Sequence, residues 1–182
     1  MKTKIIAIVT IVVIAVGGTL FLYKNTAAPS NETAPLSLPA EYKNATYGIN
    51  GTSIQLTNGY AETEIAPGSA SKLITRYFGN EATGDLTGSG MSDVAFLITQ
   101  TGGGSGTFYY VVAALKTPSG YKGTNAILLG DRIAPQVTEI KNGEIIVNYA
   151  DRKPGEPMTK QPSIGVSKYL RLENGVLVES IR

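Results

Sequence analysis

The segment from Asp85 to Asp93 (DLTGSGMSD) has the residue types and the spacing of a loop that binds a calcium ion. Calcium loops place oxygen ligands at alternate positions, with glycine where the chain turns sharply. Oxygen atoms fall here at positions 1, 3, 5, 7 and 9, supplied in order by Asp85, Thr87, Ser89, the carbonyl of Met91, and Asp93. Only two of these ligands are carboxylates, so we expect any calcium binding to be weak. A glycine-rich turn that keeps the shape without the ion is the alternative.

This loop resembles the calcium loop of FG-GAP/VCBS-type β repeats, which reads D-x-N-G-D-G-x-x-D and is followed by a hydrophobic strand. The resemblance covers Asp85 to Thr99, and it departs from the pattern at Thr87 and Ser89, where the family has Asn and Asp. It implies a loop that braces a β structure, as in adhesins and other surface proteins. The sequence contains a single copy, so a propeller built from several blades is not supported.

A second candidate is the stretch from Asp151 to Ser163 (DRKPGEPMTKQPS), the longest part of the folded region without strand character. Long loops in compact domains often carry function, so a binding role is one interpretation. A solvated crossover between two strands is the other. The charged residues that we consider as binding candidates are Asp151, Arg152, Lys153, Glu156 and Lys160.

The chain contains no histidine and no cysteine. The commonest general base, the commonest zinc ligand and all thiol chemistry are therefore absent, as are disulfides. We favour a non-catalytic protein for this reason, without any required cofactor. The alternative is a carboxylate-dependent envelope hydrolase, which would use Asp85, Asp93, Asp131 or Asp151. Asp131 also precedes Arg132, and we expect these two residues to form a structural ion pair.

The start of the chain predicts where these residues are located. Lys2 and Lys4 precede nineteen uncharged residues, Ile5 to Tyr23, and Lys24 ends the run. A helix of that length spans roughly 28 Å, close to the thickness of a bilayer's hydrocarbon core. The distribution of lysines favours a cytoplasmic N-terminus and an exported C-terminal part. A cleaved signal peptide is the alternative, but its apolar core is usually shorter, and the residues around Ala27 and Ala28 make poor cleavage sites.

The expected organisation has four parts. Asn25 to Ala40 is rich in Ala, Pro, Ser and Thr, which is typical of an extended tether. We therefore expect a cytoplasmic stub at 1–4, a transmembrane anchor at 5–23, a flexible tether at 24–41 and an exported β domain at 42–182. The part after Lys24 has a net charge of −1 and no block of basic residues. Nucleic acid as a partner is therefore excluded, and the membrane is expected to be contacted through the N-terminal helix.

Asn-Gly pairs indicate how the exported part folds. They occur at 50–51, 58–59, 142–143 and 174–175, each between strand-like runs, and Asn-Gly favours the two-residue type I′ hairpin. Two-residue turns at the first two pairs would place Tyr47 on one apolar face with Ile54, Leu56 and Ile65. This register predicts a three-stranded meander. The third pair predicts a hairpin with Ile140 and Ile145 on one face.

Two runs are apolar on both faces, 94–99 (VAFLIT) and 108–115 (FYYVVAAL), and they are joined by the glycine-rich segment 102–106. Such runs are typical of central strands that are covered on both sides. Residues 73–78 are expected to form a strand, because they include Thr, Tyr and Phe together. The fold class that we predict is all-β and antiparallel, either sandwich-like or a strongly bent sheet built from hairpins, after one N-terminal transmembrane helix.

The exported part also resembles a group of membrane-anchored envelope proteins from small-genome candidate-phylum bacteria, to which no activity is assigned. The segments that carry the resemblance are RYFGNEATGDLTGSGMSDVAFLITQ, GSGTFYYVVAALKT, LLGDRIAPQ and IIVNYADRKPGEP. Some members of that group are associated with lysozyme-inhibitor-like domains, which implies a role in the envelope. The function that we expect is an extracytoplasmic binding, inhibitor or structural module, whose partner is an envelope protein or a glycan.

Overall fold

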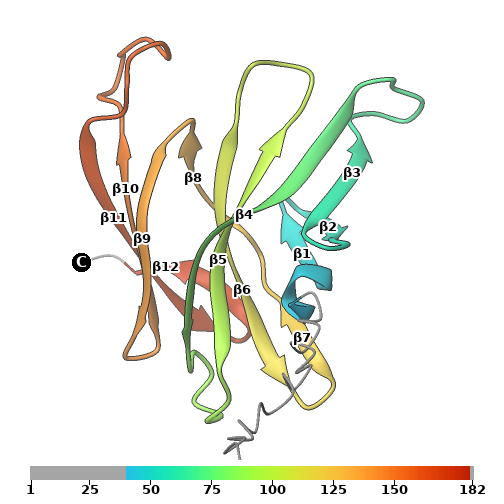
Figure 1. Cartoon of the computed structure of the whole chain (residues 1–182), viewed down its shortest axis with the longest axis vertical. Coiled ribbons are helices and arrows are strands. Elements are labelled where there is room, and N and C mark those ends of the chain that lie inside the picture. The colour runs from blue at the N-terminus through green and yellow to red at the C-terminus, as the bar shows by residue number, and fades with distance from the viewer. Residues whose placement is uncertain (1–39, 181–182) are drawn as a thin grey trace, which may run out of the picture. The chain divides into compact units, whose positions relative to one another are not determined.

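The computed structural model describes residues 40–180, which form one short 3-10 helix and twelve strands (Figure 1). All strand pairs within its sheets are antiparallel. The elements are η1 (Glu41–Asn44), β1 (Thr46–Ile49), β2 (Thr52–Gln55), β3 (Tyr60–Glu64), β4 (Lys72–Gly84), β5 (Asp93–Thr101), β6 (Phe108–Thr117), β7 (Gly120–Gly123), β8 (Ile127–Asp131), β9 (Ala134–Lys141), β10 (Glu144–Asp151), β11 (Ile164–Glu173) and β12 (Val176–Glu179). The all-β, antiparallel class predicted from the sequence is confirmed.

The strands form three sheets. The central sheet has the order β3-β4-β5-β6-β7, and β8 pairs with the other end of β6. A second sheet has the order β12-β11-β10-β9, and β1 and β2 form a separate hairpin. In Figure 1 the second sheet and the β1–β2 hairpin lie on opposite sides of β5 and β6.

The four Asn-Gly turns are confirmed. Asn50 and Gly51 have φ angles of 50° and 79°, and the other three pairs also have positive φ at both positions. Positive φ at both central residues is the signature of a type I′ turn, whose twist matches that of the flanking strands. The first turn pairs Tyr47 with Ile54, and the third pairs Ile140 with Ile145, as expected.

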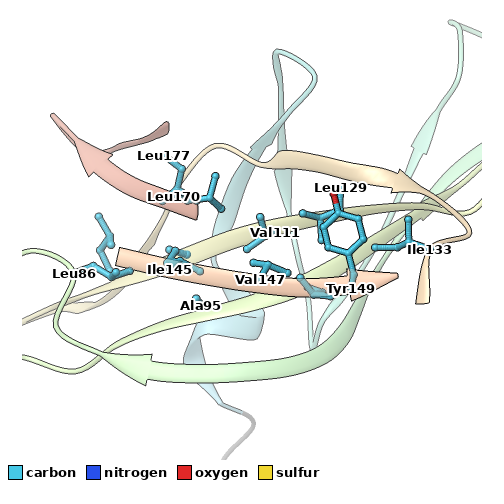
Figure 2. Packing of buried hydrophobic residues seen from close by; sticks show 13 residues of the cluster. Leu86, Ala95, Val111, Leu129, Ile133, Ile145, Val147, Tyr149, Leu170 and Leu177 are labelled. Atoms are coloured by element: carbon cyan, nitrogen blue, oxygen red, sulfur yellow. The ribbon is translucent and has the colours of Figure 1, made fainter. Parts of the chain in front are cut away.

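Strands β5 and β6 are buried on both faces, which confirms the prediction for the two apolar runs. One face of the pair contributes Leu97 and Val111 to a core shared with β8 and β10–β12. Figure 2 shows this core, in which Ile145, Val147 and Tyr149 of β10 pack beside Ala95 and Val111. The opposite face of β5 and β6 contributes Phe96, Ile98 and Val112 to a second core, which the β1–β2 hairpin covers.

The second core lies inside an incompletely closed barrel. At one side, Gly48 of β1 bridges Asn125 in parallel: its N–H donates to Thr124 at 3.0 Å, and its carbonyl accepts from Ala126 at 2.7 Å. The barrel therefore closes between β1 and the segment after β7. Gly123 makes this approach feasible, because a Cβ at that position would lie 2.2 Å from the carbonyl oxygen of Thr46.

The helix η1 covers one end of this barrel. Tyr42 packs against Phe96 at a centroid distance of 5.4 Å, and the hydroxyls of Tyr42 and Tyr77 both donate to the carboxylate of Glu81. Burial, followed by the nearby Glu81, raises the pKa of both phenols above the usual range. The folded unit therefore begins before residue 42: helix η1 starts at Glu41, inside the expected tether.

The three-stranded meander predicted for residues 45–65 is wrong. The Asn58–Gly59 turn forms, but only Thr57 and Tyr60 pair across it. Beyond the turn, β3 pairs with β4 and not with β2. The close packing of Gly59 against Tyr77 ties the turn to β4, and Ile65, which follows β3, is exposed.

The predicted stub, anchor and most of the tether lie outside the described residues. Within residues 40–180, no helix has both the length and the apolar character needed to cross a membrane.

Candidate functional site

The 85–93 loop is organised around the carboxylate of Asp85. One carboxylate oxygen accepts the backbone N–H groups of Thr87, Gly88 and Ser89 at 3.1, 2.7 and 3.2 Å, and the other accepts that of Gly90 at 2.7 Å. The N–H of Gly90 is the main reason why the pKa of Asp85 lies below its ordinary value. Gly88 and Gly90 have φ of 73° and 77°, which lets the chain wrap around the carboxylate.

Asp93 joins this loop to the central sheet. Its carboxylate is fully buried, and it accepts the backbone N–H of Leu86 and that of Lys116, both at 2.8 Å. The first bond closes the loop onto its own start, and the second connects it to β6. Asp93 therefore fixes the position at which β5 begins, which is the structural role expected for this loop.

The oxygen atoms of the loop are engaged mainly in hydrogen bonds within the loop. Both carboxylates accept backbone N–H groups, whereas calcium requires oxygen atoms that face the ion. The hydroxyl of Thr87 donates to that of Ser89 at 2.8 Å, and the N–H of Met91 donates to Ser89 as well. Among residues 40–180, no group of three or more acidic residues is placed to hold a metal. Calcium binding stays a prediction.

The 151–163 loop connects the neighbouring strands β10 and β11, so it is a long hairpin loop and not a crossover. Arg152 fastens it to the corner that follows β8. Its guanidinium donates to the carbonyls of Arg132 at 2.9 Å and of Lys160 at 2.5 Å. The N–H of Arg152 donates to the carboxylate of Asp151 at 2.7 Å. Arg152 and Asp151 thus serve the shape of the loop.

The Asp131–Arg132 ion pair is confirmed, with 2.9 Å between Nη2 and the carboxylate. Asp131 also accepts the N–H of Thr107 at 2.8 Å. The pKa of Asp131 lies below its usual range, mainly because Arg132 bonds its carboxylate, and the N–H of Thr107 lowers it further. These contacts hold the 102–107 loop, the corner after β8 and the 151–163 loop together.

Glu156 and Lys160 form an ion pair within the 151–163 loop, at 2.5 Å, and the N–H of Lys153 donates to Glu156 at 3.1 Å. The lysine is the main reason for the lowered pKa of Glu156. The predicted binding residues are therefore brought together, but they bond mainly to one another and to nearby backbone. The loop after β10 and the loop before β5 lie at opposite ends of the strands (Figure 1). The four aspartates of the hydrolase hypothesis consequently do not converge.

A groove of about 550 Å³ lies on the face of the second sheet that points away from the core. Its centre combines Ile146 of β10 with its partner Tyr169 of β11. Glu144, its partner Arg171 and Lys141 line the same groove, beside the Asn142–Gly143 turn. Arg171 bonds Glu173 at 2.8 Å, which holds its guanidinium in place. We name this feature the β10–β11 groove.

Sequence reasoning missed the β10–β11 groove. The alternation that placed Ile145 and Val147 in the core also assigns Ile146 to the outer face. An isoleucine among charged residues on an exposed face was the available signal. Tyr169 lies beside Ile146 because β10 pairs with β11 across a loop of twelve residues. The spacing of residues in the sequence does not predict this pairing.

A second groove, of about 280 Å³, lies where the barrel is open. Strand β2 lines it with Thr52 and Ile54, and β3 lines it with Thr63, together with Ile65 just beyond the strand. Gln100 of β5 also lines it, and its amide donates to the hydroxyl of Thr75 at 3.1 Å. We name this feature the β2–β3 seam.

Comparisons of the chain with protein-family models, with curated proteins and with solved structures found no match.

Proposed function

We propose that this protein is a non-catalytic binding module of the cell envelope, which recognises a glycan through the β10–β11 groove. The observation that carries the proposal is the placing of Tyr169 and Ile146 among Lys141, Glu144 and Arg171 on one exposed sheet face. Binding sites commonly combine an apolar surface with a few polar groups that fix orientation.

The residue types of the groove suit a sugar ring. A sugar presents C–H groups on its faces and hydroxyls around its rim. The tyrosine ring and the isoleucine side chain offer an apolar surface for the C–H groups. The carboxylate can accept hydrogen bonds from the sugar hydroxyls, and the ammonium and guanidinium groups can donate to them.

The location is part of the same proposal. The sequence predicts a single-pass anchor that places the β domain outside the cytoplasm, close to envelope polymers. The resemblance to membrane-anchored envelope proteins supports the same location outside the cytoplasm. A module held there by a tether would bind the cell-wall glycan or an envelope protein bound to it.

The hydrolase alternative has less support. Glycoside hydrolysis commonly needs two carboxylates that flank the bond. The β10–β11 groove and the β2–β3 seam each contain one carboxylate, Glu144 and Glu64 respectively. Asp85 and Asp93 share one loop, Asp131 and Asp151 lie around the corner after β8, and all four accept backbone N–H groups.

The test is co-sedimentation of the full-length chain, in detergent micelles, with insoluble peptidoglycan. We expect the wild type to sediment with the polymer and Tyr169→Ala to lose most of this binding. Tyr60→Ala is a matched control, because it removes a half-buried tyrosine from a different sheet. Equal sedimentation of the wild type and Tyr169→Ala would contradict the groove as the site. Release of soluble sugar fragments from the polymer by the wild type would favour the hydrolase.

A further inference from the structure

Among residues 40–180, the β2–β3 seam is the side on which the strands around the second core are not paired in a sheet. Strands β3 to β7 form a continuous sheet, and Gly48 of β1 is bonded to the segment after β7. Going around the barrel, the remaining neighbours are β2 and β3, which pair only at Thr57 and Tyr60 beside their turn. From there the two strands diverge, and the seam opens between them.

Both strands present unpaired backbone along the seam. In the β1–β2 hairpin, Tyr47 and Ile54 face each other as a hydrogen-bonded pair, so the N–H and C=O groups of Ser53 and Gln55 point away from β1. In the β3–β4 pair, the N–H of Tyr77 donates to the carbonyl of Gly59, and hydrogen-bonded pairs alternate with non-bonded pairs from there. The N–H and C=O groups of Glu62 and Glu64 therefore point away from β4. Within residues 40–180, β2 and β3 are not paired in any sheet, so these outward groups face an edge without a neighbouring strand.

The seam is apolar inside and acidic at its β3 edge. Ile49, Ile54 and Leu73 line the interior, and Ile65 stands at the rim with 51% of its surface exposed. The carboxylates of Glu62 and Glu64 lie on the exposed face of β3. Glu64 is paired with Lys72 at 3.1 Å, whereas Glu62 has no ion pair in the described part of the chain.

We propose that the β2–β3 seam binds an extended segment of a partner protein, which enters as an additional strand and completes the barrel. An extended polypeptide is the ligand whose N–H and C=O groups alternate in the pattern that strand edges require. Its side chains alternate between two faces. Those that point inward meet Ile49, Ile54 and Leu73, and those that point outward lie beside Glu62 and Glu64. The partner segment therefore alternates apolar residues with basic ones.

The charge of the β3 edge argues against a second copy of this chain as the occupant. Antiparallel pairing of β3 with β3 of another copy would bring Glu62 and Glu64 opposite like charges, which destabilises a strand pair. Charged residues on an edge strand are a common protection against such self-association. The same carboxylates favour a basic partner.

The experiment titrates the isotope-labelled full-length chain, in micelles, with a short synthetic peptide that alternates lysine with valine. Amide chemical shifts and hydrogen exchange of Ser53, Gln55, Glu62 and Glu64 are measured. Two control peptides accompany it, one with N-methylated valine amides and one with glutamate in place of lysine. The Glu62→Lys variant reverses the charge at an exposed position and leaves the barrel interior unchanged.

We expect saturable shifts centred on the four seam residues and slower exchange of their amides. The N-methylated peptide should bind at least about tenfold more weakly, as the loss of one or two backbone hydrogen bonds predicts. Glu62→Lys should weaken binding of the lysine peptide and strengthen that of the glutamate peptide. The proposal is overturned by equal binding of the N-methylated peptide, or by shifts outside the seam. It is also overturned if the lysine peptide does not bind at millimolar concentration. Slow exchange of the seam amides in the free chain would likewise contradict it, because it would show that β2 and β3 pair with each other.

Discussion

The side chain of Asn125 exchanges two hydrogen bonds with the backbone of Leu177: its Oδ1 accepts the Leu177 N–H at 2.7 Å, and its Nδ2 donates to the Leu177 carbonyl at 3.0 Å. The amide thus acts as a strand partner for the edge of β12. Because Asn125 is also the residue that Gly48 bridges, one residue connects the second sheet to the seam-bearing barrel.

Replacement of Asn125 by alanine should destabilise the fold. The change removes both bonds and leaves the groups of Leu177 without partners, at a cost of about 1–3 kcal/mol. Gln136→Ala, an exposed position on β9, should stay within about 0.5 kcal/mol of the wild type. Urea unfolding monitored by circular dichroism measures both. Equal midpoints for the two variants would show that the amide link contributes nothing.

Asp93→Ala should have a larger effect than a surface substitution in the same loop. The variant leaves two N–H groups, those of Leu86 and Lys116, without an acceptor in the interior, at about 1–3 kcal/mol each. Ser92→Ala changes the neighbouring exposed residue and serves as the control. If thermal denaturation gives the same midpoint for both, Asp93 does not anchor the loop.

The Asp85 carboxylate should stabilise the fold only in its ionised form. Its folded-state pKa lies below the unfolded value of about 3.9, because the N–H of Gly90 and its neighbours bond the charged form. The stabilisation is therefore present above about pH 4 and is lost as the pH falls through the folded pKa. The difference in unfolding free energy between the wild type and Asp85→Asn should be constant near neutral pH and shrink in acid. A difference that grows below pH 4 would reverse the sign and contradict this assignment.

Calcium should have little effect on thermal stability. Only two carboxylates, Asp85 and Asp93, are among the five ligand positions, and both already accept backbone N–H groups. We expect no shift of the melting temperature at micromolar free calcium and at most a small one at millimolar concentration. For comparison, calcium at about 100 times its Kd would add roughly 2.7 kcal/mol. A shift of several degrees at micromolar calcium that disappears in Asp85→Ala would show a true calcium loop.

A fragment comprising residues 37–182 should fold on its own. The buried residues of both cores lie between Ala45 and Leu177, within the described residues 40–180. A fragment beginning at residue 46 loses η1 and the packing of Tyr42 on Phe96, so it should be less stable by at least about 2 kcal/mol. Circular dichroism and thermal melts measure both. A disordered spectrum from the longer fragment would show that the first thirty-six residues are required for folding.

The sequence predicts the local features of this fold well, because each depends on short-range chemistry. Asn-Gly fixed the four turns, and apolar residues on both faces identified β5 and β6 as central. Strand pairing at longer range was less accessible. The hairpin pattern around Asn58 and Gly59 is satisfied locally, yet β3 pairs with β4, because the contact of Gly59 with Tyr77 is tertiary.

The candidate site was predicted only in part for the same reason. The glycines and aspartates of the 85–93 loop predict a tight turn in which Asp85 accepts backbone N–H groups, and this is confirmed; the buried bonds of Asp93 to Leu86 and Lys116 depend on tertiary packing. The charged residues of the 151–163 loop come together as expected, and they bond to one another. The β10–β11 groove and the β2–β3 seam depend on which strands become neighbours and which do not.

The central claim is that the β10–β11 groove binds a glycan without cleaving it. Its most direct test is an NMR titration of the isotope-labelled full-length chain, in micelles, with soluble peptidoglycan fragments. We predict that the largest amide shifts occur at Lys141 to Ile146, Tyr169 and Arg171, and that the fragments remain intact. Shifts centred on Asp131 and Asp151, cleavage of the fragments, or no shift at millimolar concentration would contradict the account.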